Sequence, residues 1–142
     1  MINHVGFTGT RDGMQPNQKL ELAEYLRFLK EQGYTHLHHG DCIGADAQAA
    51  KLAKELGFIV IAHPGQIRDP NNTMYRAFTD FNDEVKEPKP TKVRDRDIVD
   101  AADVMIAAPW GEEVLRSGTW CTVRHARKKQ KSIHIIYPSK KK

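Results

Sequence analysis

Short apolar segments alternate with longer amphipathic segments along most of this chain, and this alternation restricts the fold more than any other feature. The apolar segments have the length of β-strands and fall at residues 2–7, 35–38, 58–62, 103–109 and 133–137. The amphipathic segments carry apolar residues at helical spacing and fall at residues 16–33, 45–57, 94–102 and 120–131. Strands that alternate with helices are joined by right-handed crossovers into a parallel sheet with helices on both faces. The sequence therefore predicts an α/β three-layer sandwich with a mainly parallel sheet of about five strands.

A long segment without a clear pattern interrupts this alternation. Residues 65–92 are rich in Asp, Asn and Pro, and only residues 74–85 have a pattern that allows a short helix. A connection of this length in a compact domain is often a lid or a specificity loop. We expect one domain over residues 1–138, with a long loop at about 65–92 and a basic tail at 139–142.

The loop at residues 39–46 joins an expected strand to an expected helix and contains two glycines. The first N–H groups of a helix lack intrahelical partners, and the helix dipole favours an anion beside them. Gly40 and Gly44 have no side chains that would keep a phosphate away from the backbone. We therefore predict that this loop holds a phosphate, although it is neither a G-x-G-x-x-G fingerprint nor a Walker loop.

Two further loops follow expected strands in the same way. The first, residues 8–13, contains two threonine hydroxyls and Arg11, whose guanidinium can hold a phosphate through two hydrogen bonds. A turn with a solvated Arg11 explains this loop equally well. The second ends in Ser117-Gly118-Thr119, where a hydroxyl can cap the next helix and Gly118 leaves backbone donors accessible. Because the carboxyl ends of parallel strands meet at one edge of a sheet, the three loops predict a shared pocket.

Length and composition limit the number of domains and the cellular compartment that we expect for this protein. The chain has 142 residues, the usual length of one domain, and two cysteines, too few for a disulfide framework. It has no apolar run near the roughly 20 residues that span a bilayer, and its first residues have a strand pattern rather than that of a signal peptide. We therefore expect a cytoplasmic protein that has no membrane partner.

Basic residues gather near the end of the chain, within residues 124–131 and 139–142, and the formal net charge is +4. Such a surface can attract phosphates or nucleic acid. No aromatic residues interleave with these charges, as they do in many proteins that bind single strands. A solubilising surface is therefore the favoured interpretation, and nucleic acid remains an alternative partner. A homo-oligomer is a further alternative, although no surface stripe identifies an interface.

Four histidines lie near the ends of expected strands, at positions 36, 38, 39 and 63. A His-x-His pair on one face of a strand can bind a metal ion. The spacing matches no known zinc site, however, and hydrogen-bonding or surface roles are favoured. We expect neither a metal ion nor a resident cofactor.

The motif H-G-x-x-x-G-A-D-x-x-A at residues 39–49 resembles the YspA-like branch of the SLOG superfamily. This superfamily of Rossmann-like domains includes the LOG ("lysine decarboxylase-like") proteins and the DNA-processing protein DprA. Three other segments resemble its motifs in the same order along the chain: G-F-T-G-T-R at residues 6–11, R-D-R-D-I at residues 94–98, and I-A-A-P-W-G followed by G-T at residues 106–111 and 118–119. The resemblance covers most of the chain and implies a Rossmann-like fold.

The resemblance also implies a nucleotide-type ligand between the three loops, with Arg11 and Arg94 as counter-charges. Trp110, which stands where the superfamily has a glycine, could stack on a base. The positions that would surround the ligand and its phosphate are Gly9, Thr10, Arg11, Gly40, Asp41, Gly44, Ala45, Asp46, Arg94, Pro109, Trp110, Ser117, Gly118 and Thr119.

LOG enzymes remove the base from a nucleoside 5′-monophosphate with an arginine, which Arg94 matches, and a glutamate just after the G-T motif. Here Trp120-Cys121-Thr122 follows that motif and brings no carboxylate. Cleavage of an N-glycosidic bond needs a carboxylate near the anomeric carbon. The candidates for catalytic roles are Arg94, Asp46, Asp41, Glu112 and Glu113.

Binding of a nucleotide or a nucleotide-derived small molecule, in a sensing, sequestering or carrier role, is the function that these observations favour. One alternative is a nucleoside 5′-monophosphate N-glycoside hydrolase, and a second is nucleic-acid binding similar to that of DprA.

Overall fold

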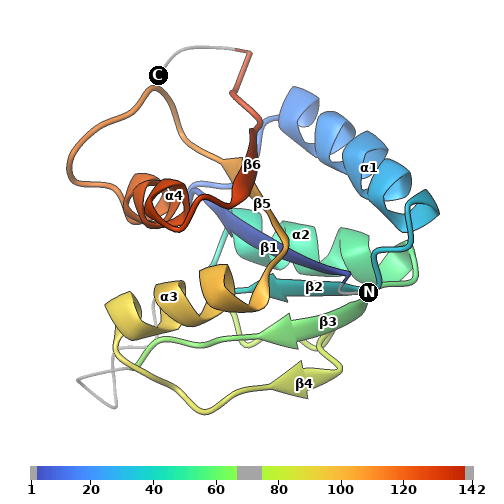
Figure 1. The fold of residues 1–142 in the computed structure, drawn as a ribbon, viewed down its shortest axis with the longest axis horizontal. Helices are drawn as coiled ribbons and strands as arrows, with labels where there is room; N and C mark the ends of the chain where they lie inside the picture. The colour runs from blue at the N-terminus through green and yellow to red at the C-terminus, as the bar shows by residue number, and fades with distance from the viewer. Residues whose placement is uncertain (1–2, 67–74, 140–142) are drawn as a thin grey trace.

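The computed structural model describes residues 3–66 and 75–139 and contains, in these ranges, a six-stranded parallel sheet between two layers of helices (Figure 1). The strands are β1 (His4–Gly9), β2 (His36–His39), β3 (Ile59–Ala62), β4 (Glu84–Val85), β5 (Val104–Ala108) and β6 (Ser132–Ile135). The helices are α1 (Pro16–Glu31), α2 (Ala45–Glu55), α3 (Thr91–Ala101) and α4 (Gly118–Lys128). The α/β three-layer architecture predicted from the sequence is confirmed.

The strand order is β4-β3-β2-β1-β5-β6, which places the first strand of the chain near the centre of the sheet. From β1 the chain builds outward through β2, β3 and β4, and it then returns to the other side of β1 to form β5 and β6. The direction of winding therefore reverses between β1 and β5. Ligands of open α/β sheets bind at the carboxyl ends of the strands beside such a reversal.

The two helical layers bury different parts of the apolar pattern. Helices α1 and α2 cover one face, where Leu22 and Leu26 of α1 and small alanines of α2 pack with Phe7 and Leu37 of the sheet. Helices α3 and α4 cover the opposite face, where they bury smaller clusters around Met105 and around the indole of Trp120. The central strands are covered on both faces, which explains why β5 is apolar throughout.

One expected element is wrong. The short helix predicted at residues 74–85 is absent from the described residues 75–85, which end instead in β4. This strand has only two residues, both exposed, so it shows neither apolar alternation nor a β-branched run. Asp83, just before it, accepts a hydrogen bond from the N–H of Val60 and pairs with Lys54. Tertiary contacts, rather than local propensity, therefore position this edge strand.

The remaining boundaries shift by a few residues. Helix α3 begins three positions before the expected Arg94, and α4 spans 118–128 rather than 120–131. Of the expected basic tail, only Ser139 lies within the described residues, and residues 67–74 of the long loop lie outside them. Within the described part, no helix combines the length and the apolar character that crossing a membrane requires.

Candidate functional site

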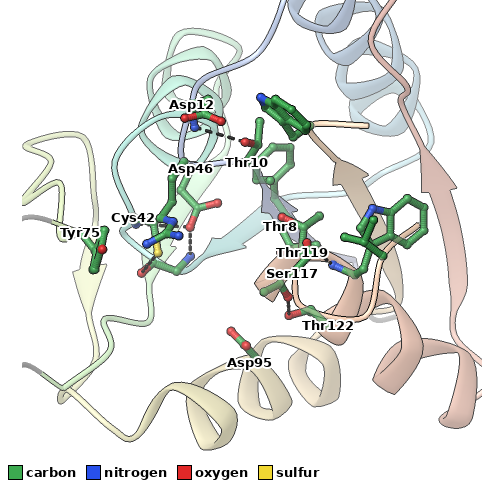
Figure 2. Close-up of a pocket in the computed structure, with 18 of the residues that line it drawn as sticks. Thr8, Thr10, Asp12, Cys42, Asp46, Tyr75, Asp95, Ser117, Thr119 and Thr122 are labelled. Carbon is green, nitrogen blue, oxygen red and sulfur yellow. Dashed lines mark hydrogen bonds between the residues drawn. The ribbon is translucent and has the colours of Figure 1, made fainter. Parts of the chain in front are cut away.

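A cavity of about 1430 Å³ opens at the carboxyl ends of β1, β2 and β5 (Figure 2). Its walls are the loop after β1, the loop between β2 and α2, the start of α3, and the segment from Trp110 to the first turns of α4. The three loops predicted to share a pocket therefore meet around one space, beside the reversal of the sheet. Of the predicted site residues, Gly9, Thr10, Arg11, Gly40, Asp46, Arg94, Trp110, Glu112, Ser117, Gly118 and Thr119 line it.

Five predicted site residues are not among those that line the cavity: Asp41, Gly44, Ala45, Pro109 and Glu113. Two of them are candidate catalytic carboxylates with other partners. The buried Asp41 pairs with Arg76 at 3.0 Å and accepts hydrogen bonds from the N–H and hydroxyl of Thr79, so it anchors the segment before β4. The exposed Glu113 pairs with Arg124 and Arg127 on the outside of α4.

The loop between β2 and α2 uses most of its N–H groups within the protein. The Asp46 carboxylate accepts hydrogen bonds from the N–H groups of Gly40 and Cys42, at 3.0 and 3.3 Å. The N–H groups of Asp41, Ile43 and Ala45 donate to the His39 ring, the Tyr75 carbonyl and the Thr10 carbonyl. These five donors are occupied, so they do not form the open phosphate cradle expected from the glycines. The side chain that faces the cavity here is an acid.

The two glycines of this loop make room for protein atoms. A Cβ atom on Gly40 would lie 2.6 Å from Nη1 of Arg94 and 2.9 Å from Oδ2 of Asp46. A Cβ atom on Gly44 would lie 2.3 Å from the carbonyl oxygen of Arg11. Gly40 therefore permits the Arg94–Asp46 approach, and Gly44 permits the loop after β1 to pack on the start of α2.

Arg94 joins three parts of the site. Its Nη1 donates to the carbonyl oxygens of Gly40 and His63, at 2.6 and 3.3 Å, and its Nε donates to Asp95 at 2.6 Å. Burial, the largest single influence, lowers the pKa of this guanidinium, but Asp95, Cys42 and Asp46 together outweigh it and raise the pKa. Arg94 is therefore a charged cross-link between α3 and the ends of β2 and β3.

Two carboxylates, Asp46 and Asp95, line the cavity close to this guanidinium. Burial raises the pKa of both carboxyl groups, against the opposing effect of the nearby Arg94. The Oδ1 atom of Asp46 is buried and has no hydrogen-bond partner among the described residues. Sequence reasoning named Asp46 but missed Asp95, whose only signal was its place directly after Arg94 in the third motif.

The N-terminus of α4 forms the opposite wall. Ser117 caps this helix by accepting a hydrogen bond from the N–H of Trp120 at 3.2 Å. The N–H groups of Gly118 and Thr119 precede the first intrahelical donors and have no acceptor among residues 3–66 and 75–139. Nothing lies within 4 Å of a Cβ position on Gly118, so the backbone here is open to the cavity. With the nearby Arg116, this wall has the geometry of an anion site.

The mouth of the cavity carries stacking groups. The guanidinium of Arg11 lies 4.2 Å from the ring centre of Tyr75, in a cation–π contact that sequence reasoning did not predict. Trp110, a half-exposed residue, lines the cavity near the anion wall. These planar side chains line the cavity and can contact a planar ligand.

These features define a Rossmann-like domain with a cleft at its switch point. No known family model and no curated protein matches the chain. Solved structures do match it, and they have the SLOG-type fold, so the fold implied by the sequence motifs is confirmed.

One similar structure is the molybdenum cofactor binding protein of the phototrophic bacterium Rippkaea orientalis, with a TM-score of 0.70, 20% identity, and coverage of 98% of this chain and 78% of that one. Another is the Moco carrier protein of Chlamydomonas reinhardtii, with a TM-score of 0.65, 20% identity, and coverage of 98% and 79%. DprA of Streptococcus pneumoniae matches with a TM-score of 0.68 at 19% identity, and the match covers 94% of this chain but 50% of DprA. At these identities the likeness concerns the fold.

Proposed function

We propose that this protein binds a phosphorylated small molecule with a planar heterocycle, such as a nucleotide or a pterin-type cofactor, and that it holds or carries this ligand without transforming it. The observation that carries the proposal is the open N-terminus of α4 in a cavity of about 1430 Å³. That wall accepts a phosphate, while the rest of the cavity has room for the heterocycle and stacking groups at its mouth.

The similar structures support the carrier role. Two of them are described as molybdenum cofactor binding or carrier proteins, and the molybdenum cofactor is itself a phosphorylated pterin. In this chain the cofactor would be cargo. It shares with nucleotides the two parts that the cavity accommodates, a phosphate and a flat ring system.

A hydrolase is the second candidate, and the carboxylates Asp46 and Asp95 favour it. They lie in the cavity beside Arg94, and burial raises the pKa of each carboxyl group, as in many general acids. Against catalysis, Nε and Nη1 of Arg94 are already engaged by protein atoms. We therefore favour a carrier over a hydrolase. An assay for turnover of the ligand distinguishes the two.

The first experiment measures binding of nucleoside monophosphates and of the molybdenum cofactor by calorimetry, with mass spectrometry of any molecule that co-purifies. Gly118→Asp places a carboxylate at the anion wall, and we expect it to weaken binding at least tenfold because like charges repel there. Ser132→Asp, which adds the same charge at an exposed position on edge strand β6, is the control and should bind as the unmodified protein does. Equal affinities for both variants would contradict the proposed phosphate site.

The same samples are then assayed for free base by chromatography. Intact ligand after long incubation at high protein concentration is the result expected of a carrier. Release of free base with a ribose phosphate would instead identify a hydrolase, and loss of that activity in Asp46→Asn or Asp95→Asn would show which carboxylate it uses.

A further inference from the structure

The Asp46 side chain, at the first turn of α2, is only 4% exposed and yet lines the cavity. Its two carboxylate oxygens have different surroundings. Oδ2 accepts two backbone hydrogen bonds from the loop before α2, whereas Oδ1 has no partner in the described part of the chain. In Figure 2 one oxygen is joined to the loop by a dashed line, and the other points away from the loop.

A buried acceptor without a partner destabilises the protein, because the group gives up its hydrogen bonds to water and gains none. Such groups are kept where a ligand or an ordered water completes them. Burial raises the pKa of this carboxyl group, whereas the two N–H donors on Oδ2 and the Arg94 guanidinium nearby favour its ionised form, in which Oδ1 is purely an acceptor. Because Oδ2 already accepts from the loop, Oδ1 is the oxygen left for a ligand. The complementary ligand group is therefore an N–H donor.

Resting on the proposed function, we propose that Oδ1 of Asp46 accepts a hydrogen bond from the exocyclic amino group of the ligand heterocycle, and that this contact selects amino-bearing rings over their oxo counterparts. The phosphate of the same ligand lies at the N-terminus of α4, across the cavity. Asp46 is thus the specificity-determining residue of the heterocycle end, and a carbonyl oxygen placed against it would be repelled.

The substitution Asp46→Asn tests this selection with almost no change of shape. The amide oxygen of Asn can still accept from Gly40 and Cys42, while its NH2 group takes the place of Oδ1 and converts an acceptor into a donor. Matched ligands are the 5′-monophosphates of cytidine and uridine, of adenosine and inosine, and of guanosine and xanthosine, since each pair exchanges an amino group for an oxo group.

We expect the unmodified protein to bind the amino member of its best pair about tenfold more tightly than the oxo member. Asp46→Asn should lower this ratio at least tenfold, and circular dichroism should confirm that the variant is folded. Asp12→Asn is the control, because it removes the same charge from an exposed residue that also lines the cavity. It should change the affinity for both members equally.

Three outcomes overturn the inference. A ratio that Asp46→Asn leaves unchanged, with binding retained, means that a water rather than the ligand completes Oδ1, and the proposed function then stands. A preference of the unmodified protein for the oxo member means that the exocyclic amino group is not the donor to Oδ1. Absence of binding to every phosphorylated ligand tested overturns the proposed function, and this inference with it.

Discussion

At Gly44 the backbone has a φ of +85° and a ψ of −124°, a conformation that residues with side chains rarely adopt. The carbonyl oxygen of Arg11 occupies the space that a Cβ atom would need. The sequence analysis predicted that the missing side chain of Gly44 makes room for a phosphate, whereas it makes room for another part of the protein. That part is a backbone atom from a loop more than 30 positions earlier in the chain, and only the folded structure brings the two together.

Gly44→Ala should therefore destabilise the protein more than backbone strain alone would. Gly33→Ala is the control, because Gly33 also has a positive φ, +99°, but nothing lies within 4 Å of its Cβ position. We expect a loss of about 1 kcal/mol in the free energy of unfolding for Gly33→Ala and about 2 kcal/mol more for Gly44→Ala. Urea denaturation measures both. Equal losses would show that the loop after β1 yields to the added methyl group.

At the scale of elements, three imidazoles form a hydrogen-bonded row across β1, β2 and the end of β3. Nδ1 of His4 lies 2.7 Å from Nε2 of His38, and Nδ1 of His38 lies 2.8 Å from Nε2 of His63. The hydrogen-bonding role favoured for His38 and His63 is confirmed. His4, the third member, belongs to the first strand and was not grouped with them, because the parallel register that aligns these strands is a tertiary property.

This row should make the sheet sensitive to acid. Burial lowers the pKa of His38 to about 3 and that of His63 to about 4, and neighbouring positive charges contribute. Both values lie below the ordinary value of 6.5, so the unfolded chain takes up protons first. The stability contributed by neutral imidazoles is complete above about pH 6.5 and falls by roughly 1.4 kcal/mol per pH unit for each histidine as the pH drops toward these values.

Urea denaturation between pH 7 and pH 4.5 tests this dependence, with His38→Gln as the variant. For this variant, the plot of the free energy of unfolding against pH should be shallower by roughly 1.4 kcal/mol per pH unit than for the unmodified protein. The raised pKa values of Asp46 and Asp95 act in the opposite direction, because their contribution is lost as the pH rises. Both proteins retain them, so the difference between the slopes isolates His38. Equal slopes for the two proteins would contradict the role of His38 in the pH dependence of stability.

At the scale of the whole molecule, the order of strands and helices could be predicted almost completely, because apolar periodicity and glycine stops are local signals. The meeting of three loops followed from the parallel sheet. The chemistry inside the cavity could not be predicted in the same way. Asp41, Asp46 and Asp95 are the same residue type, yet one anchors a loop, one faces the cavity with a free oxygen, and one neutralises Arg94. These differences arise from burial and partners, which come from distant segments.

The connection that Arg94 makes between α3, β2 and β3 should be central to stability. Arg94→Lys keeps the charge but loses the planar guanidinium, which donates to two carbonyls and a carboxylate. We expect a loss of about 2–4 kcal/mol in the free energy of unfolding. Arg96→Lys, at an exposed position on the same helix, should change it by less than about 0.5 kcal/mol. Similar values for the two variants would mean that the buried cross-link contributes little.

The central position of β1 in the sheet affects how the domain forms during synthesis. This strand precedes the other described strands along the chain, yet one of its two neighbours, β5, begins only at Val104, and the N–H of His4 bonds to a side chain 99 positions later in the chain. A nascent chain that ends before β5 exposes one edge of its central strand and lacks the wall formed by α4. The proposed ligand site is thus complete only when nearly the whole domain has emerged, and until then the open edge of β1 is available for mispairing.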